Sequence, residues 1–262
     1  AVAIQVRTRF TDPTDGDNSS DGLVFAAGEY GPGHPWTPEL IINYYIEECL
    51  GCGVQPDDPA TADVELSLRS DMDHDGHVVE SDEDSDVGEA TAVRSRTISV
   101  GDTSLDEQVI GLLSFDTSSI PADAFIVSAE LTLVRSTVRG NPQSLPLPLG
   151  DLVADMRCVA IAPDYYGDAP MPEAQDFQAF SLFENVTAAP LTYPTANGDL
   201  ATGLIKDELL PEVNKAGLTQ FKVRFVTDDN DNERTDQLLL YSGDAVRTPS
   251  LMPTLTVVYR AP

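Results

Sequence analysis

Apolar and polar side chains alternate with a period of two along several short stretches of this chain. The clearest are TQFKVRF at 219–225, AELTL at 129–133 and IQVRTRF at 4–10. Successive side chains of a β-strand point to opposite faces, so each stretch predicts a strand with one buried and one solvent-facing side. Glycine and proline breaks separate such stretches at the intervals typical of an antiparallel sandwich. The pattern therefore predicts an all-β, antiparallel β-sandwich.

Other stretches predict further strands and two short helices. Strands are expected at 64–68, 151–162, 237–241 and 254–259, and the third of these, QLLLY, is apolar enough to be covered on both faces. Thr37 can cap a helix that begins at Pro38 and stops before Gly51. A second short helix is expected at 206–216, interrupted at Pro211.

The chain divides into two parts in this interpretation. The stretch VQPDDPA at 54–60 has no periodicity, which is typical of a linker, so we expect an N-terminal segment at 1–61 and a β-sandwich domain at 62–262. The strand predicted at 4–10 can pair within its own sheet. It can also be donated to a neighbouring copy of the chain, because the backbone hydrogen bonds of a sheet are the same in both cases. Donation would build a homopolymer.

The chain is strongly acidic, with 44 Asp and Glu against 15 Lys and Arg and a net charge of −29. Such a surface repels nucleic acid and anionic membranes, so neither is expected as a partner. Self-repulsion also destabilises the folded state, and either bound divalent cations or a high-salt habitat would relieve it. No apolar stretch is long enough to span a bilayer, and the first residue is Ala1. We expect an extracellular or cell-surface protein whose signal peptide has been removed.

The densest acidic stretch lies between two of the predicted strands. It places five carboxylates and two amides in the nine residues 228–236, and the predicted metal ligands are Asp228, Asp229, Asn230, Asp231 and Asp236. Mutual repulsion would force these side chains apart unless a cation neutralised them, and oxygen ligands of this kind suit Ca²⁺. The alternative is a solvated acidic hairpin, since Asp and Asn also favour turns for backbone reasons.

A second acidic motif follows the strand predicted at 64–68. Asp71, Asp73 and Asp75 alternate along it, and Asp82 occupies the twelfth position counted from Asp71. This is the spacing of an EF-hand-type calcium loop, in which alternate side chains converge on the ion and a final carboxylate completes the shell. The motif departs from that pattern because its last ligand is Asp rather than Glu and a strand precedes it. A solvated β-turn without metal is the alternative.

Cysteines and aromatic residues suggest two more features. Cys49 and Cys52 predict a local disulfide in an oxidising compartment, because a zinc site would need a second pair of ligands. Trp36, Tyr165 and Tyr166 would stack on sugar rings if they were exposed, whereas burial in the core is the more frequent arrangement of such side chains.

Several segments of the chain resemble one known family. They are DGHVVESDEDSDVG at 75–88, SVGD at 99–102, SFDTSSIPADAFIVSAELTL at 114–133, DFQA at 176–179, TQFKVRFVTDDNDN at 219–232, YSGD at 241–244 and PTLTVVY at 253–259. Residues 62–262 thereby resemble the DNRLRE-type domain, a group of secreted β-sandwich modules allied with carbohydrate-binding modules. The resemblance implies a jelly-roll-like sandwich, extracellular display and no catalytic apparatus. It transfers no binding residue to this chain, and residues 1–60 have no counterpart in it.

The sequence contains no nucleophile elbow, phosphate-binding glycine loop or complete zinc signature, so we expect a protein that is not an enzyme. Two functions remain. The first is an extracellular, calcium-stabilised structural protein that forms a filament or surface layer by N-terminal strand addition. The second is a glycan-binding or adhesion module for an extracellular polysaccharide. We favour the first.

Overall fold

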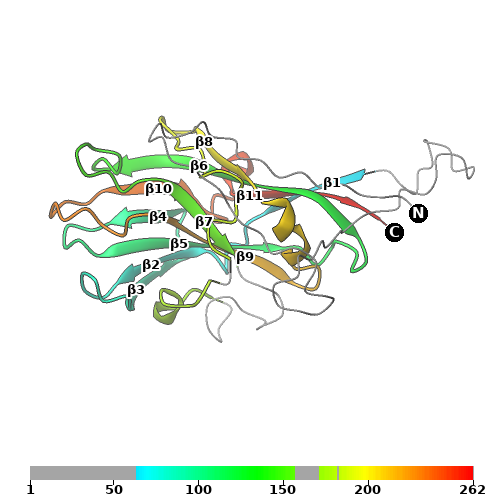
Figure 1. Ribbon diagram of the computed structural model, residues 1–262, viewed down its shortest axis with the longest axis horizontal. Coiled ribbons are helices and arrows are strands. Elements are labelled where there is room, and N and C mark those ends of the chain that lie inside the picture. The colour runs from blue at the N-terminus through cyan, green and yellow to red at the C-terminus, as the bar shows by residue number, and fades with distance from the viewer. Residues whose placement is uncertain (1–62, 157–170, 182, 262) are drawn as a thin grey trace, which may run out of the picture. The chain divides into compact units, whose positions relative to one another are not determined.

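The computed structural model describes residues 63–156, 171–181 and 183–261, and these form an antiparallel all-β structure (Figure 1). Its strands are β1 (Asp63–Arg69), β2 (Gly76–Glu80), β3 (Gly88–Val93), β4 (Thr97–Asp102), β5 (Gln108–Asp116), β6 (Phe125–Arg139), β7 (Leu152–Met156), β8 (Leu200–Leu204), β9 (Leu218–Phe225), β10 (Gln237–Tyr241) and β11 (Thr254–Arg260). Three short 3₁₀ helices are η3 (Ala174–Asp176), η4 (Asp207–Glu212) and η5 (Pro249–Leu251). The predicted all-β antiparallel class is confirmed.

The long strand β6 belongs to both parts of the sheet. One part contains β1, β11 and β8, and the other contains β10, β4, β5, β2, β3, β9 and β7. Its first two thirds pair with β11 and β8, and its last residues pair with β10. The strand order is β1-β11-β6-β10-β4-β5-β2-β3, while β9 pairs with both β5 and β7. Strands β4 and β5 therefore lie between β10 and β9, although β9 and β10 are consecutive in sequence. The connection from β9 to β10 must cross the end of the β4–β5 hairpin.

One large apolar core lies between the two parts of the sheet. Phe221, Val223 and Phe225 of β9 point into it, as their alternation predicts, and the rings of Phe221 and Phe115 meet edge to face at 5.9 Å. The other strands contribute in the same way, with Ile98 and Val100 of β4, Leu131 and Leu133 of β6, Leu238 and Leu240 of β10, and Leu255 and Val257 of β11. Burial of this many aliphatic and aromatic side chains is the main stabilising contribution to the fold.

The second face of β9 is covered, contrary to the sequence-based expectation that it faces water. Lys222 is only 8% exposed, and its ammonium donates hydrogen bonds of 2.9 Å to the carbonyl oxygens of Phe177 and Ala179. Phe177 also packs against Ile110 in a small apolar cluster on this outer face. Alternation along a strand reports only local spacing, so it cannot predict a segment that folds back over the polar side.

The predicted helix at 206–216 is a shorter 3₁₀ helix, η4, which contains Pro211 and ends before Val213. The predicted strands at 64–68, 237–241 and 254–259 correspond to β1, β10 and β11. Of the strand predicted at 151–162, β7 provides 152–156. The strand predicted at 4–10, the helix predicted from Pro38 and the Cys49–Cys52 disulfide lie outside the described residues. Within the described part of the chain, no helix is long and apolar enough to cross a membrane.

Candidate functional site

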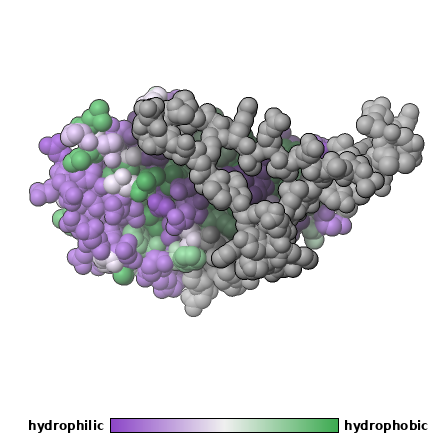
Figure 2. All heavy atoms as spheres, in the orientation of Figure 1, coloured by the Kyte–Doolittle hydropathy of each residue, from purple (hydrophilic) through white to green (hydrophobic). Residues whose placement is uncertain are grey.

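Three loops meet at one end of the sheet, and we call them together the acidic rim: the 81–87 turn, the 103–107 turn and the 226–236 loop. The 226–236 loop reaches this position because it must cross the β4–β5 hairpin, and the backbone N–H groups of Asn232 and Glu233 donate to Asp106 of that hairpin. Hydrophilic residues gather over this end of the molecule, on the left in Figure 2. The fold therefore brings together negatively charged side chains from three segments that are separate in the sequence.

Asp102, the last residue of β4, lies at the buried centre of the rim. It is 0% exposed, and its Oδ1 accepts a hydrogen bond of 2.8 Å from the N–H of Asp236. Its Oδ2 is buried and accepts no hydrogen bond from any described residue. Burial raises the pKa of Asp102 to about 7, and the negative charges of Asp236, Asp106 and Asp229 add to this, while the N–H of Asp236 opposes it. Asp102 therefore has no positively charged partner among the described residues.

Two amides that bind Asp236, the hydrogen-bond partner of Asp102, also have side-chain oxygens without donors among the described residues. Asn230 and Asn232 each donate their side-chain N–H groups to Oδ2 of Asp236, at 3.2 and 2.8 Å. Their carbonyl oxygens are buried and have no hydrogen-bond donor among the described residues. Buried polar atoms are nearly always paired in folded proteins, because an unpaired one costs about 1–3 kcal/mol. A donor-poor, oxygen-rich and negative setting is what Ca²⁺ requires, since this ion takes six to eight oxygen ligands.

The outer part of the rim holds a second group of oxygens. One carboxylate oxygen from each of Asp84, Asp228 and Asp229 lies within 4.8 Å of the other two. Burial raises the pKa of Asp229, and the charges of Asp228, Asp231 and Asp106 reinforce the shift against the N–H of Asp231. These groups are more exposed than Asp102, so water can solvate them without a metal.

The structure distributes the predicted ligands of the 228–236 loop among different roles. Asp228 and Asp229 belong to the outer group, and the carbonyl oxygen of Asn230 is buried with no donor among the described residues. Asp231 instead donates its N–H to Asp229 at 3.0 Å. Asp236 is already satisfied: burial would raise its pKa, but the N–H of Asn141 and the two Asn amides hold the pKa below its usual value. We therefore regard Asp236 as an organising residue of the loop.

Asp102 and Asp106 are absent from the sequence-based prediction of this site. They lie at least 120 residues from the 226–236 loop in sequence, and Asp106 and Asn232 are 126 residues apart. One signal was available, because the buried strand TISVGD ends on a carboxylate. A buried strand that ends on an acid suggests a partner there, but the sequence does not identify which loop provides it.

The second predicted motif is not a single twelve-residue loop. Strand β2 occupies 76–80, between the turn that carries Asp71, Asp73 and Asp75 and the turn that carries Asp82. A strand advances about 3.4 Å per residue, so five residues separate the two turns by about 17 Å. Asp82 therefore belongs to the acidic rim and cannot join the other three around one ion. The predicted shared site of these four residues is wrong in this respect.

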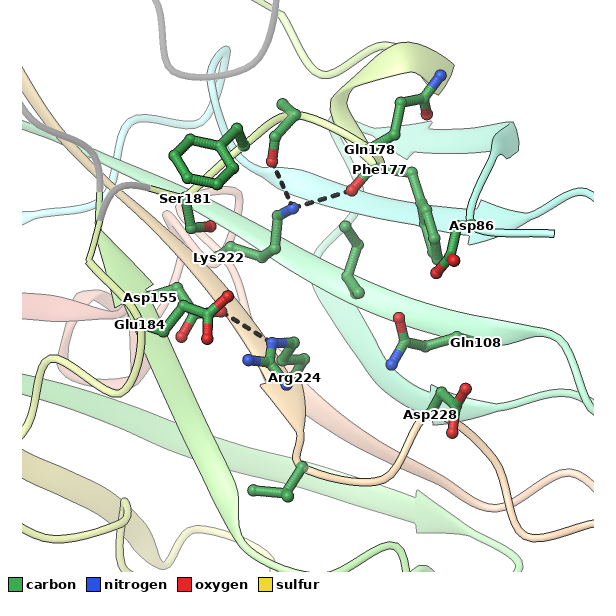
Figure 3. Close-up of a pocket in the computed structure, with 14 residues that line it drawn as sticks. Asp86, Gln108, Asp155, Phe177, Gln178, Ser181, Glu184, Lys222, Arg224 and Asp228 are labelled. Carbon is green, nitrogen blue, oxygen red and sulfur yellow. Dashed lines mark hydrogen bonds and ion pairs between the residues drawn. The ribbon is translucent and has the colours of Figure 1, made fainter. Parts of the chain in front are cut away.

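A polar pocket of about 520 Å³ lies on the outer face of β9 (Figure 3). Lys222 and Arg224 line it, and Arg224 Nε lies 2.8 Å from the buried Oδ2 of Asp155. The lining also includes Phe180, which is 77% exposed. Burial lowers the pKa of Lys222 to about 8, partly offset by the nearby charge of Asp155.

The three aromatic residues predicted to stack on sugars, Trp36, Tyr165 and Tyr166, lie outside the described residues. The pocket offers a different aromatic side chain, Phe180, which was not among the aromatic residues predicted to stack on sugars. Nothing in the local sequence distinguishes it, because its position depends on the segment that folds over Lys222.

Comparison with known proteins adds no identification: no family model matches this chain, and no curated protein matches it significantly. The class that the fold defines is an antiparallel β-sandwich with an acidic rim. The resemblance to DNRLRE-type domains remains a prediction from the sequence.

Proposed function

We propose that this chain is a non-catalytic, calcium-stabilised structural module of the extracellular space or cell surface. The observation that carries the proposal is Asp102, a fully buried carboxylate whose Oδ2 has no hydrogen-bond donor among the described residues. Asp236, whose N–H binds the other oxygen of Asp102, also binds the side chains of Asn230 and Asn232, and the amide oxygens of these two residues are likewise buried without a donor in the described part of the chain. A bound Ca²⁺ would satisfy all three. Extracellular calcium is abundant enough for sites with dissociation constants of about 10⁻⁴–10⁻³ M, which supports a location outside the cell.

The role of the ion follows from the topology. Asp102 belongs to β4, whereas Asn230 and Asn232 belong to the loop that crosses over it. A cation held by both segments fixes the crossing loop on the β4–β5 hairpin and lowers the repulsion within a chain of net charge −29. An ion that binds only the folded state stabilises it by mass action, by about 2.7 kcal/mol at a hundredfold excess over the dissociation constant.

Thermal unfolding in calcium and in EDTA, at pH 7.5, tests the proposal. Wild-type protein is expected to melt several degrees higher in saturating calcium, because about 2–4 °C correspond to 1 kcal/mol in a domain of this size. Asp102→Asn removes the buried charge, so it should raise the melting temperature in EDTA and abolish most of the gain from calcium. Asp123→Asn, at an exposed position, should preserve the wild-type gain. Identical wild-type melting curves in calcium and EDTA would contradict the proposal.

A second candidate function, glycan binding, is favoured by the pocket of Figure 3. Sugars stack on exposed aromatic rings and exchange hydrogen bonds with amides and charged groups, and the pocket combines Phe180 with Gln108, Gln178 and Arg224. Phe180→Ala should then weaken retention on immobilised polysaccharides, whereas Phe125→Ala, a partly exposed phenylalanine that does not line the pocket, should not. Equal retention of both variants and wild type would exclude this function for the pocket.

A further inference from the structure

The turn at 70–75 packs directly against the loop at 242–244, far from it in sequence. A side-chain carbon on Gly243 would lie 2.6 Å from the carbonyl oxygen of Ser70 and 2.8 Å from the backbone nitrogen of Met72, so the two segments touch through their backbones. The N–H of Gly243 also donates a hydrogen bond of 2.7 Å to Oδ2 of Asp75. This contact lies at the start of β2, whereas the 81–87 turn of the rim follows its end.

Asp75 is the buried centre of this contact. It is 1% exposed, and its second oxygen, Oδ1, has no hydrogen-bond donor among the described residues. The Ser70 hydroxyl lies close enough to lower the pKa of Asp75, but it makes no hydrogen bond of good geometry and is itself a buried group without a partner. Burial dominates and raises the pKa of Asp75 to about 6.

A second carboxylate from the other segment faces Asp75. Asp244 lies close enough to raise the pKa of Asp75 by its charge, and its Oδ2 is also buried with no hydrogen-bond partner among the described residues. Asp71 adds a further negative charge near Asp75. Arg94 pairs with Asp73 at 3.1 Å, at an exposed position, and its charge also acts on Asp244. The pKa of Asp244 is nevertheless raised, because burial and the charge of Asp73 outweigh Arg94.

We infer that the 70–75 turn and the 242–244 loop form a second Ca²⁺ site, held by Oδ1 of Asp75, Oδ2 of Asp244 and the Ser70 hydroxyl. Asp71 supplies additional charge beside it. Asp244, from a loop 168 residues beyond the turn at the Gly243 contact, takes the place that the sequence spacing gives to Asp82. The site is independent of the acidic rim and would join the entrance of β2 to the end of β10.

Calcium titration of the full chain by isothermal calorimetry, with hydrogen exchange to locate the bound ions, tests this inference. Asp75→Asn and Asp244→Asn should each weaken one class of binding by at least about tenfold, the loss of roughly 1.4 kcal/mol. Calcium should slow exchange in peptides covering 70–76 and 241–246 of the wild type, and this protection should disappear in both variants. Asp207→Asn, at an exposed position, should behave as wild type.

The rim and the second site are separated by combining variants. In Asp102→Asn protein, calcium should still protect 70–76 and 241–246, whereas rim peptides should lose their protection. Unchanged calcium affinity and stoichiometry in both Asp75→Asn and Asp244→Asn would overturn the second site, whatever happens at the rim. Should Asp75→Asn fail to fold, the less buried Asp244→Asn alone decides the question.

Discussion

Lys222 shows how a single residue can contradict its own pattern. It occupies a polar position of the alternating strand TQFKVRF, yet it is almost fully buried and donates to two backbone carbonyls. Those hydrogen bonds satisfy the ammonium group only in part, because burial lowers the pKa of Lys222 from its ordinary value of 10.5 to about 8. The folded state therefore carries a charge that destabilises it at neutral pH.

This destabilisation has a defined dependence on pH. Between about pH 8 and 10.5 the unfolded chain retains a proton that the folded chain has lost, so the stability contributed at this residue rises as pH increases. Relative to Lys222→Met, the wild-type free energy of unfolding should increase by about 2 kcal/mol between pH 7 and pH 10. Chemical denaturation of both proteins at several pH values measures the difference, and the variant cancels other titrating groups. A difference that stays constant with pH would show that Lys222 ionises normally.

The alternation of apolar and polar residues predicted which side chains point into the core, but it did not predict which residues form the acidic rim. Phe221, Val223 and Phe225 followed from periodicity, because any strand that buries one face must bury these. Asp102 could not be recognised in the same way, since a terminal acid on a strand is usually solvated. Asp102 matters because the tertiary fold brings negatively charged neighbours to it, among them Asp236.

At the scale of elements, the end of β4 depends on a glycine. Gly101 has φ of +133°, and a side-chain carbon there would lie 2.1 Å from the carbonyl oxygen of Asp236. That carbonyl accepts the N–H of Asp102 at 3.1 Å, while the N–H of Asp236 returns a hydrogen bond to the Asp102 carboxylate. The close approach of the crossing loop to β4 therefore requires the absence of a side chain at this position.

Gly101→Ala should destabilise the protein by on the order of 3 kcal/mol, from steric overlap and from the strained backbone together. Gly198→Ala is a matched control, because Gly198 also has positive φ, +91°, but no atom lies within 4 Å of its added carbon. The control should cost only about 1–2 kcal/mol. Urea unfolding of the two variants provides the comparison, and equal losses would mean that the loop does not press on Gly101.

The strands themselves were predictable, whereas their neighbours in the sheet were not. The 219–225 and 237–241 stretches are β9 and β10, but they pair with different strands instead of forming a hairpin. Sequence distance favours the hairpin, and only long-range packing places β4 and β5 between them. The same limit explains the error at Asp82, because the chain between Gly76 and Glu80 forms a strand and removes Asp82 from the preceding turn.

At the scale of the whole molecule, strand β1 ends the sheet within the described part of the chain. Strand β1 pairs with β11 on one side and with no strand on its other side within the described part of the chain. We propose that the 4–10 stretch of a neighbouring copy adds there, which would build a filament or surface layer. Most residues of β1 are exposed, and a strand that receives another strand at its edge must be accessible in this way.

Deletion of residues 1–10 tests assembly separately from calcium binding. The shortened protein should remain folded, with its calcium-dependent melting intact, but should form no polymers in electron micrographs or by light scattering. A variant that changes Val6 and Thr8 to proline is a finer test, because proline removes backbone donors from a strand without shortening the chain. Polymers of unchanged length from both proteins would exclude strand donation by this segment.

The most direct test of the account is anomalous diffraction from crystals of the whole chain grown with calcium. We predict a strong anomalous peak in contact with Oδ2 of Asp102 and the carbonyl oxygens of Asn230 and Asn232, at about 2.3–2.6 Å from each oxygen. A well-ordered rim with water alone beside these three oxygens would contradict the central claim that calcium stabilises this fold.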